Sequence, residues 1–180
     1  MKRSLENISY ENRTVKKNFD TILISGKKLF NFSSNDYLSL SKNTKIINES
    51  KKWSEIYGSS LSSSRFVSGN LDKISVIESK LSEFTGKEKS LIFSGGFLMN
   101  STLIPTLTGN TLGQRNKVEI FSDKLNHASI NYGCYLTRQR VYRYNHLDLN
   151  HLEYLLKRSD KKTPKFIISE TLFSMDGDLA

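Results

Sequence analysis

The sequence has little cysteine, proline or glycine, and it has no long apolar run. A single cysteine, Cys134, excludes an internal disulfide framework and a cysteine-rich zinc site, so we expect a small buried thiol. Two prolines and 10 glycines argue against collagen-like and low-complexity chains, and a hydrophobic share of 37% argues against disorder. No apolar run approaches the roughly 18–20 residues that cross a bilayer, and residues 1–19 lack the apolar segment of a signal peptide. We therefore expect a globular, cytoplasmic protein with no membrane partner.

Acidic residues are also in short supply. The chain has 18 Asp and Glu against 27 Lys and Arg, which gives a formal charge of +9. An excess of this sign is typical of nucleic-acid-binding proteins. However, the lysines are scattered, no run of five basic residues occurs, and aromatic residues do not alternate with basic ones as on single-strand-binding surfaces. We therefore expect no nucleic-acid partner.

Short apolar strands alternate with helical patterns along most of the chain. Strands are predicted at residues 91–93, 118–121, 141–144 and 166–169, and helices at 46–57, 74–84, 97–106, 128–137 and 149–156. Strands separated by such helices imply right-handed crossovers, so the predicted fold class is α/β, with a mainly parallel sheet and flanking helices. We expect residues 5–19 to form a surface helix, and residues 1–60 to form a helical and extended segment apart from residues 61–180.

Glycine and polar residues follow three predicted strands, at the sheet edge where open α/β folds place their ligands. Gly96 and Phe97 follow the first, where backbone N–H groups at a helix start either hold a phosphate or simply form a tight turn. The spacing matches neither the dinucleotide fingerprint nor the nucleoside-triphosphate loop. His127 follows the next strand and either faces the same crevice or caps the helix that begins there. Glu170 and Ser174 bring a carboxylate and a hydroxyl to this edge after the third.

Other chemistries find little support in the sequence. His146 and His151 are expected at the surface, and no pair of histidines has the spacing of metal ligands, so we expect no metal site. No serine lies in a G-x-S-x-G turn, which argues against a nucleophilic triad.

Seven segments, taken in order, resemble one enzyme family. They read NFSSNDYLSL (31–40), SRFVSGN (64–70), GKE (86–88), LIFSGGFLMN (91–100), FSDKLNHASI (121–130), RYNHLD (143–148) and SETLFSMDGD (169–178). This set resembles the α-oxoamine synthases, fold-type I pyridoxal-phosphate enzymes that condense an amino acid with an acyl-CoA and release carbon dioxide. The resemblance covers residues 30–180. It implies that residues 61–180 are the N-terminal part of the large, cofactor-binding domain of such a transferase.

The resemblance implies roles for the residues at the sheet edge. Gly96 and Phe97 match the turn whose backbone N–H groups bind the phosphate of pyridoxal 5'-phosphate. His127 matches the histidine that stacks on the pyridine ring and so tunes it as an electron sink. Glu170 and Ser174 match polar residues near the cofactor, with Ser174 close to its ring oxygen. His127, Glu170 and Ser174 are therefore the expected catalytic set.

Substrate, partner and branch of the family are also implied by resemblance. Asn35 and Ser64 match positions that contact the acyl-CoA or acyl-carrier thioester across a homodimer interface. Within the family, residues 68–70 and 176–180 resemble the 8-amino-7-oxononanoate synthases of biotin synthesis, which use a pimeloyl thioester and alanine. The 5-aminolevulinate synthases and the 2-amino-3-ketobutyrate ligases remain alternatives, as does a non-catalytic protein that pairs with a full-length relative.

The chain departs from the family pattern in two ways. Where the family has glycines, in its G-x-G-x-G-G-S-R loop and in NDYLGL, this chain has Ser60, Ser62, Ser63 and Ser39. At a positive φ, each serine would cost on the order of 1 kcal/mol. The family's Asp-x-Ala-His segment and the lysine that binds the cofactor match nothing in residues 1–180. We therefore expect the N-terminal half of an enzyme, without the small domain and inactive alone. Its expected partner is a second copy in a homodimer or a complementing C-terminal fragment.

Overall fold

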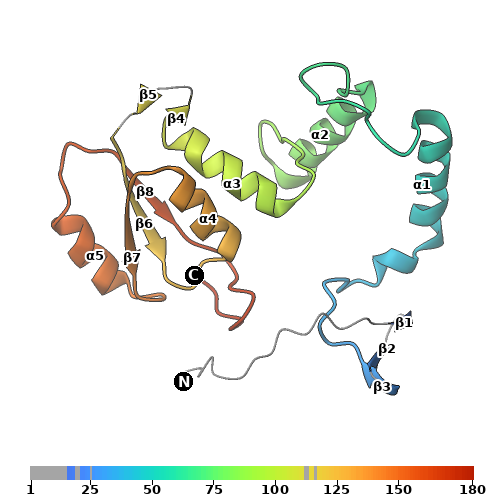
Figure 1. Ribbon diagram of the computed structural model, residues 1–180, viewed down its shortest axis with the longest axis horizontal. Helices are drawn as coiled ribbons and strands as arrows, with labels where there is room; N and C mark the ends of the chain where they lie inside the picture. The colour runs from blue at the N-terminus through green and yellow to red at the C-terminus, as the bar shows by residue number, and fades with distance from the viewer. Residues whose placement is uncertain (1–15, 19–20, 25, 112–113, 116) are drawn as a thin grey trace. The chain divides into compact units, whose positions relative to one another are not determined.

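The computed structural model describes residues 16–18, 21–24, 26–111, 114–115 and 117–180 (Figure 1). The chain divides into two compact units, Met1–Leu71 and Asp72–Ala180. Among the residues described, no helix is long and apolar enough to span a bilayer.

The first unit combines a small antiparallel sheet with one long helix. Strands β1 (Lys16–Asn18), β2 (Thr21–Ile24) and β3 (Lys27–Phe30) pair in that order. A short 3-10 helix, η1 (Leu40–Lys42), precedes helix α1 (Thr44–Tyr57). The side chain of Asn43 caps α1 by accepting the Lys45 N–H at 3.0 Å. The helix stops at Gly58, whose φ of 78° only glycine adopts easily, so the predicted helix is confirmed.

The surface helix predicted over residues 5–19 is wrong at residues 16–18. These residues form β1, in which Lys16 pairs with Leu23 and Lys17 with Ile22. Pairing with the apolar β2 strand therefore overrides a weak helical pattern. The other residues of the predicted helix lie outside the described part of the chain.

The second unit contains a three-stranded parallel sheet, which confirms the α/β class. Strand β6 (Glu119–Asp123) lies between β7 (Arg140–Tyr144) and β8 (Lys165–Ile168), and both pairings are parallel. Helix α4 (Ala128–Leu136) connects β6 to β7, and α5 (Leu149–Lys157) connects β7 to β8 (Figure 1). Upstream of the sheet are α2 (Asp72–Thr85), α3 (Gly96–Leu107) and a pair of two-residue strands, β4 (Asn110–Thr111) and β5 (Gln114–Arg115).

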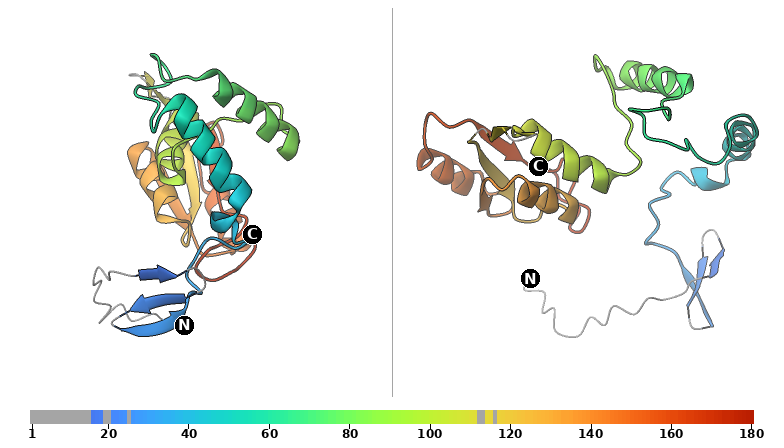
Figure 2. Two further views of the ribbon diagram at one scale, coloured as in Figure 1. Left: turned by 90° about the vertical axis from the view of Figure 1, so that its right-hand side faces the viewer. Right: turned by 45° about the horizontal axis from the view of Figure 1, so that its top comes forward.

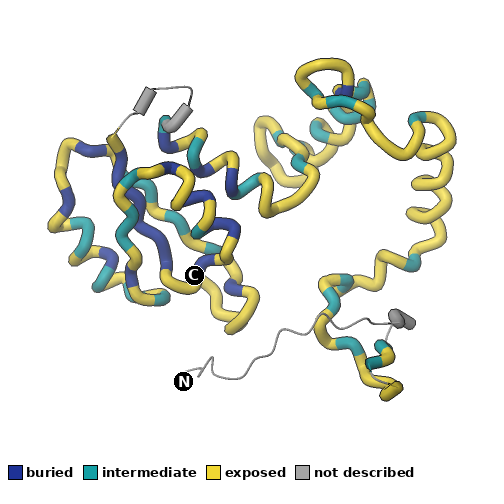
Figure 3. The backbone as a smooth tube through the Cα atoms, viewed as in Figure 1, coloured by how far each residue is buried: buried dark blue, intermediate teal, exposed yellow. Residues whose placement is uncertain are grey.

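Strand β6 is buried along its whole length, and its alternating side chains enter two cores. On one face, Ile120 packs with Ile104 of α3 and with Ile130 and Cys134 of α4. On the other face, Phe121 belongs to a cluster with α5 and β7. Helices α3 and α4 therefore cover one face of the sheet and α5 the other, and the buried residues concentrate there (Figures 2 and 3). Cys134 is buried as expected, and burial raises the pKa of its thiol.

The strand predicted at residues 91–93 is wrong, because this segment has irregular backbone. The Ile92 N–H, which would have joined a strand ladder, donates instead to the carboxylate Oε1 of Glu78 at 2.8 Å. A side chain of α2 thus satisfies the backbone group that the apolar pattern had assigned to a sheet.

Candidate functional site

Helix α3 begins at the glycine pair that the sequence singled out. Its N-cap, Gly95, has extended backbone, and the Gly95 carbonyl accepts the Met99 N–H at 3.0 Å. The first N–H groups of a helix have no partner within it, and no side chain caps them here. A Cβ built on Gly95 or Gly96 would meet no atom within 4 Å, so the turn borders open space. An anion can approach these N–H groups closely, and the helix dipole favours it.

His127 is the N-cap of helix α4, so one of the two uses expected for it is present in the structure. Its Nδ1 atom accepts the backbone N–H of Ser129 at 3.1 Å and also lies 2.6 Å from the Ser129 hydroxyl. The residue itself is exposed. Capping therefore fixes the imidazole without burying it, and a flat aromatic group can still lie against its face.

Glu170 contacts the loop that carries His127. Its Oε1 atom accepts the backbone N–H of His127. Glu170 lies just beyond the end of β8, separated from Ile168 by one residue. Beneath this contact, the buried side-chain amide of Asn126 donates to the Ser122 hydroxyl at 2.9 Å and to the Ile168 carbonyl at 2.8 Å. The ends of β6 and β8 are thus joined by hydrogen bonds at the edge where the sequence predicted a site.

Ser174 lies in the turn that closes the second unit, and it is exposed. The Gly177 N–H donates to the Phe173 carbonyl at 2.8 Å, and the Phe173 N–H donates to the Asp178 carbonyl at 2.9 Å. The Phe173 ring is 1% exposed and anchors this turn in the second unit. The structure records no hydrogen bond from Ser174 to His127 or Glu170 among the described residues, so Ser174 shares the sheet edge without joining their contact.

A carboxylate–imidazole–carboxylate cluster fixes the Ser174 turn, and sequence reasoning missed it. Asp123, fully buried at the end of β6, lies 3.0 Å from Nδ1 of His146, whose Nε2 lies 3.2 Å from Asp178. The ring of Phe173 contacts the His146 ring edge-on, with the two ring centroids 4.4 Å apart. The expected surface position of His146 is therefore wrong, since its side chain is only 20% exposed.

The pKa values in this cluster move in opposite directions. Burial alone would raise the pKa of Asp123, but hydrogen bonds from the Leu125 and Leu147 N–H groups and from His146 leave it lowered. The hydrogen bond with Asp123 raises the pKa of His146, and Asp178 adds to this effect. Both shifts favour the ion pair.

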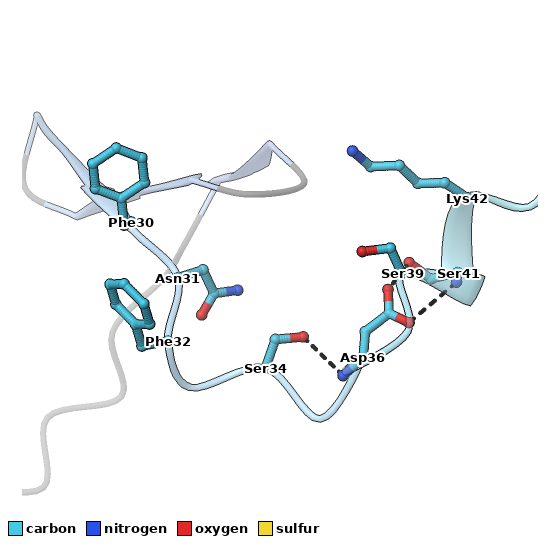
Figure 4. A pocket seen from close by; sticks show the side chains of 8 residues that line it. All are labelled: Phe30, Asn31, Phe32, Ser34, Asp36, Ser39, Ser41 and Lys42. Carbon is cyan, nitrogen blue, oxygen red and sulfur yellow. Dashed lines mark hydrogen bonds between the residues drawn. The ribbon is translucent and has the colours of Figure 1, made fainter.

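The two residues expected at the substrate, Asn35 and Ser64, lie in the first unit. Asn35 is exposed and accepts the Tyr37 hydroxyl at 3.4 Å. Its segment borders a hollow of about 260 Å³, in which Asp36 accepts the Ser41 N–H at 3.3 Å and donates its own N–H to Ser34 at 3.1 Å (Figure 4). Asn35 itself does not line this hollow.

Ser64 is exposed, and its carbonyl fixes the loop that follows it. This oxygen accepts the Val67 N–H at 3.1 Å and the Gly69 N–H at 2.9 Å. A Cβ on Gly69 would collide with the Ser63 carbonyl, so the loop can close this tightly only with glycine there. The loop is therefore held by backbone contacts, which leave the Ser64 hydroxyl at the surface.

Within the second unit, the structure brings the start of α3, His127 and Glu170 into one hydrogen-bonded region. Asn100 of α3 donates from Nδ2 to the Ser129 hydroxyl at 2.9 Å, and Ser129 contacts His127. The rings of Phe97 and Tyr132 add a second contact between α3 and α4, with centroids 5.5 Å apart. This region can hold an anion at one end and a flat ring at the other.

Comparison with known proteins gives the same family as the motifs. The aminotransferase class I and II profile matches residues 27–180. The 8-amino-7-oxononanoate synthase of Geobacter sulfurreducens is 39% identical over 159 residues, which are 88% of this chain and 39% of that protein. The enzyme of that name from Gluconacetobacter diazotrophicus is 38% identical over 157 residues, 86% of this chain and 39% of that protein. The chain thus spans about 40% of the length of the curated relatives it matches.

Two solved structures, of differently named enzymes, resemble this fold. A serine palmitoyltransferase variant from S. paucimobilis, solved with a bound PLP–myriocin aldimine, matches with a TM-score of 0.83 at 26% identity over 93% of this chain and 42% of that chain. The 8-amino-7-oxononanoate synthase of Francisella tularensis matches with a TM-score of 0.64 at 28% identity over 82% of this chain and 38% of that chain.

Proposed function

Because the chain belongs to the aminotransferase class I and II family, we propose that it is part of a pyridoxal-phosphate-dependent, decarboxylating C-acyltransferase of the α-oxoamine synthase kind. The names of its relatives favour 8-amino-7-oxononanoate synthase of biotin synthesis as the specific enzyme. The observation that carries the proposal is the hydrogen-bonded link between the start of α3 and the exposed cap His127.

The residues present fit pyridoxal phosphate at two points. The first turn of α3 offers uncapped N–H groups next to open space, which suits the phosphate. The exposed imidazole of His127, held at Nδ1, suits a stacked pyridine ring. When bound, the cofactor supplies an electron sink for bond changes at the α-carbon of an amino acid.

The chain's own groups have separate tasks in this proposal. Gly96 and Phe97 bind the phosphate through backbone N–H groups, and His127 orients the ring. Glu170 accepts the backbone N–H of His127 and so helps to hold the imidazole in position at the sheet edge. The Ser174 hydroxyl, exposed in its turn, is available to the ring oxygen.

The proposed substrates and partners come from the family motifs that contain Asn35 and Ser64. We propose that Asn35 and Ser64 contact an acyl-CoA or acyl-carrier thioester, with a small amino acid as the second substrate. Both side chains are exposed, which such a contact requires. A homodimer, or a complementing C-terminal fragment, would complete the site, and the cytoplasm is the proposed compartment.

The test replaces the glycine at the proposed phosphate turn. We expect the chain to bind pyridoxal phosphate weakly and Gly96→Val to reduce the affinity by roughly tenfold or more, because the new side chain fills the space of the anion. Equilibrium dialysis or calorimetry measures the two affinities.

Thr102→Val is the matched control for this experiment. Thr102 lies in the same helix and is exposed, and its hydroxyl donates to the Leu98 carbonyl at 2.8 Å, within α3 itself. We expect this variant to bind like the parent. Equal affinities for Gly96→Val and the parent would show that the phosphate turn is misassigned.

A further inference from the structure

We propose that Ser129 and Asn100 are positioning residues that hold the His127 imidazole in one orientation and one tautomer against the cofactor ring. The inference rests on the proposed function, because that function gives the imidazole a reason to be fixed. Neither residue is placed in contact with the ring. Both act through His127.

The argument begins at Nδ1 of His127, which faces two groups of Ser129. The backbone N–H of Ser129 lies 3.1 Å away and the hydroxyl 2.6 Å away. A backbone N–H can only donate, so Nδ1 must accept. The proton of the neutral ring is therefore on Nε2, and one tautomer is selected.

The Ser129 hydroxyl is fixed in turn by Asn100. Nδ2 of Asn100 donates to the Ser129 Oγ at 2.9 Å, so the hydrogen of that hydroxyl is directed to His127. Ser129 is 1% exposed, and water therefore does not compete for these bonds. The chain from amide to hydroxyl to imidazole has a single direction, because it begins at a donor and ends at an acceptor.

Packing between α3 and α4 fixes the far end of this chain. A Cβ on Gly133 of α4 would collide with the Asn100 carbonyl oxygen and come within 2.9 Å of Ile104 Cδ1. Glycine thus lets the two helices approach until the Asn100 backbone cannot shift. Asn100 also lies one turn after Gly96, about 6 Å along the helix axis. One helix therefore carries the phosphate turn and orients the ring partner at a fixed offset, as a preorganised site requires.

The test reads the ring nitrogens of His127 in the full chain. With ¹⁵N-labelled histidine at alkaline pH, we expect the parent to show the Nε2–H tautomer by NMR. Ser129→Ala removes the hydroxyl but keeps the backbone N–H, so we expect Nε2–H to remain the main tautomer, the Nδ1 signal to shift because its shorter contact is lost, and pyridoxal phosphate affinity to fall roughly tenfold.

Two variants of Asn100 separate positioning from packing. Asn100→Asp has nearly the same shape, but its carboxylate accepts the Ser129 hydrogen and withdraws it from His127. Asn100→Ala removes more of the side chain yet leaves the hydroxyl free to donate to His127. We therefore expect Asn100→Asp to change the ring-nitrogen shifts more than Asn100→Ala does, the reverse of what a packing role gives.

Ser101→Ala is the matched control, because it removes a buried hydroxyl on α3 that does not contact His127 and donates instead to the Leu98 carbonyl at 3.1 Å. Its ring signals should equal those of the parent. Unchanged shifts in both Ser129→Ala and Asn100→Asp, or a larger effect of Asn100→Ala, would overturn the proposal. If Ser129→Ala does not fold, the comparison of Asn100→Asp with Asn100→Ala tests the proposal by itself. The proposed function and this inference can fail separately. If only the proposed function is wrong, the parent binds no pyridoxal phosphate, while the ring-nitrogen shifts of His127 still change in Ser129→Ala and Asn100→Asp.

Discussion

Ser39 and Ser62 have backbone angles that favour glycine. Their φ values are 51° and 58°, in the left-handed region, and both replace glycines of the family pattern. Ser60 and Ser63 replace family glycines too, but neither has a positive φ. The expected strain is therefore confined to two of the four serines.

Replacing either strained serine with glycine should stabilise the chain. A left-handed conformation costs an L-residue about 1–2 kcal/mol, while glycine loses about 0.5–1 kcal/mol more backbone entropy on folding. We expect Ser39→Gly and Ser62→Gly each to raise the free energy of unfolding by about 0.5–1 kcal/mol. Urea titration measures the change.

Ser63→Gly serves as the control for this pair. It has no strain to relieve and only adds entropy to the unfolded chain, so it should lower stability by about 0.5 kcal/mol. A common sign for all three variants would contradict the assignment of strain to Ser39 and Ser62.

At the scale of elements, the His146 cluster joins the end of β6 to the closing turn. Because the pKa of His146 is raised, its contribution to stability is complete below an unfolded value of about 6.5 and is lost as pH rises through the folded value. The lowered pKa of Asp123 gives a contribution that is present above about pH 3.9 and is lost as pH falls through its folded value. The cluster should be strongest between these limits.

We expect the free energy of unfolding to fall in the parent as pH rises above about 6.5, and this fall to be absent in His146→Gln. Denaturant titrations at several pH values measure both. His151→Gln is the control, because His151 accepts the Asn145 N–H at 3.0 Å instead of facing two carboxylates. An identical pH profile in His146→Gln and the parent would refute the role of the cluster.

Elements with a clear internal period were predictable from sequence. The helices α1 to α5 and the strands β6 to β8 were expected within a few residues, because amphipathic spacing and apolar runs are local signals. The segment at 91–93 has such a run, but a side chain 14 positions earlier takes its N–H. Tertiary contacts of this kind leave no local pattern.

The same limit applies to the site residues. His127 and Glu170 were predicted because they follow strands at the sheet edge where open α/β folds place their ligands. His146 was misplaced because its partners lie 23 and 32 positions away in the sequence. The link from Asn100 to Ser129 spans 29 positions and depends on how α3 packs on α4, which no spacing rule encodes.

At the scale of the whole molecule, residues 1–180 lack any lysine that matches the family's cofactor-binding position. Loss of an essential group of this kind lowers rates by several orders of magnitude. We expect no measurable synthase activity from residues 1–180 alone, and no absorbance from lysine-bound cofactor after excess pyridoxal phosphate is removed.

Co-expression with the C-terminal part of a relative should restore activity, and His127→Ala should then abolish it. A coupled assay of thioester consumption measures both. Turnover by residues 1–180 alone, lost in His127→Ala, would refute the need for a second part.

The strand order β7-β6-β8 determines when each strand can pair as the chain is synthesised on the ribosome. Strand β6 is central but emerges first, and its second neighbour, β8, begins only at Lys165, roughly 46 residues after Glu119. At about 5–20 residues per second, the backbone N–H and C=O groups on that edge of β6 remain without their strand partner for roughly 2–9 s. During this interval α4 and β7 can fold onto one side, while the other edge is open to association with nascent chains. We therefore expect the parallel topology that builds the edge of the proposed site to leave an unpaired strand edge exposed during synthesis.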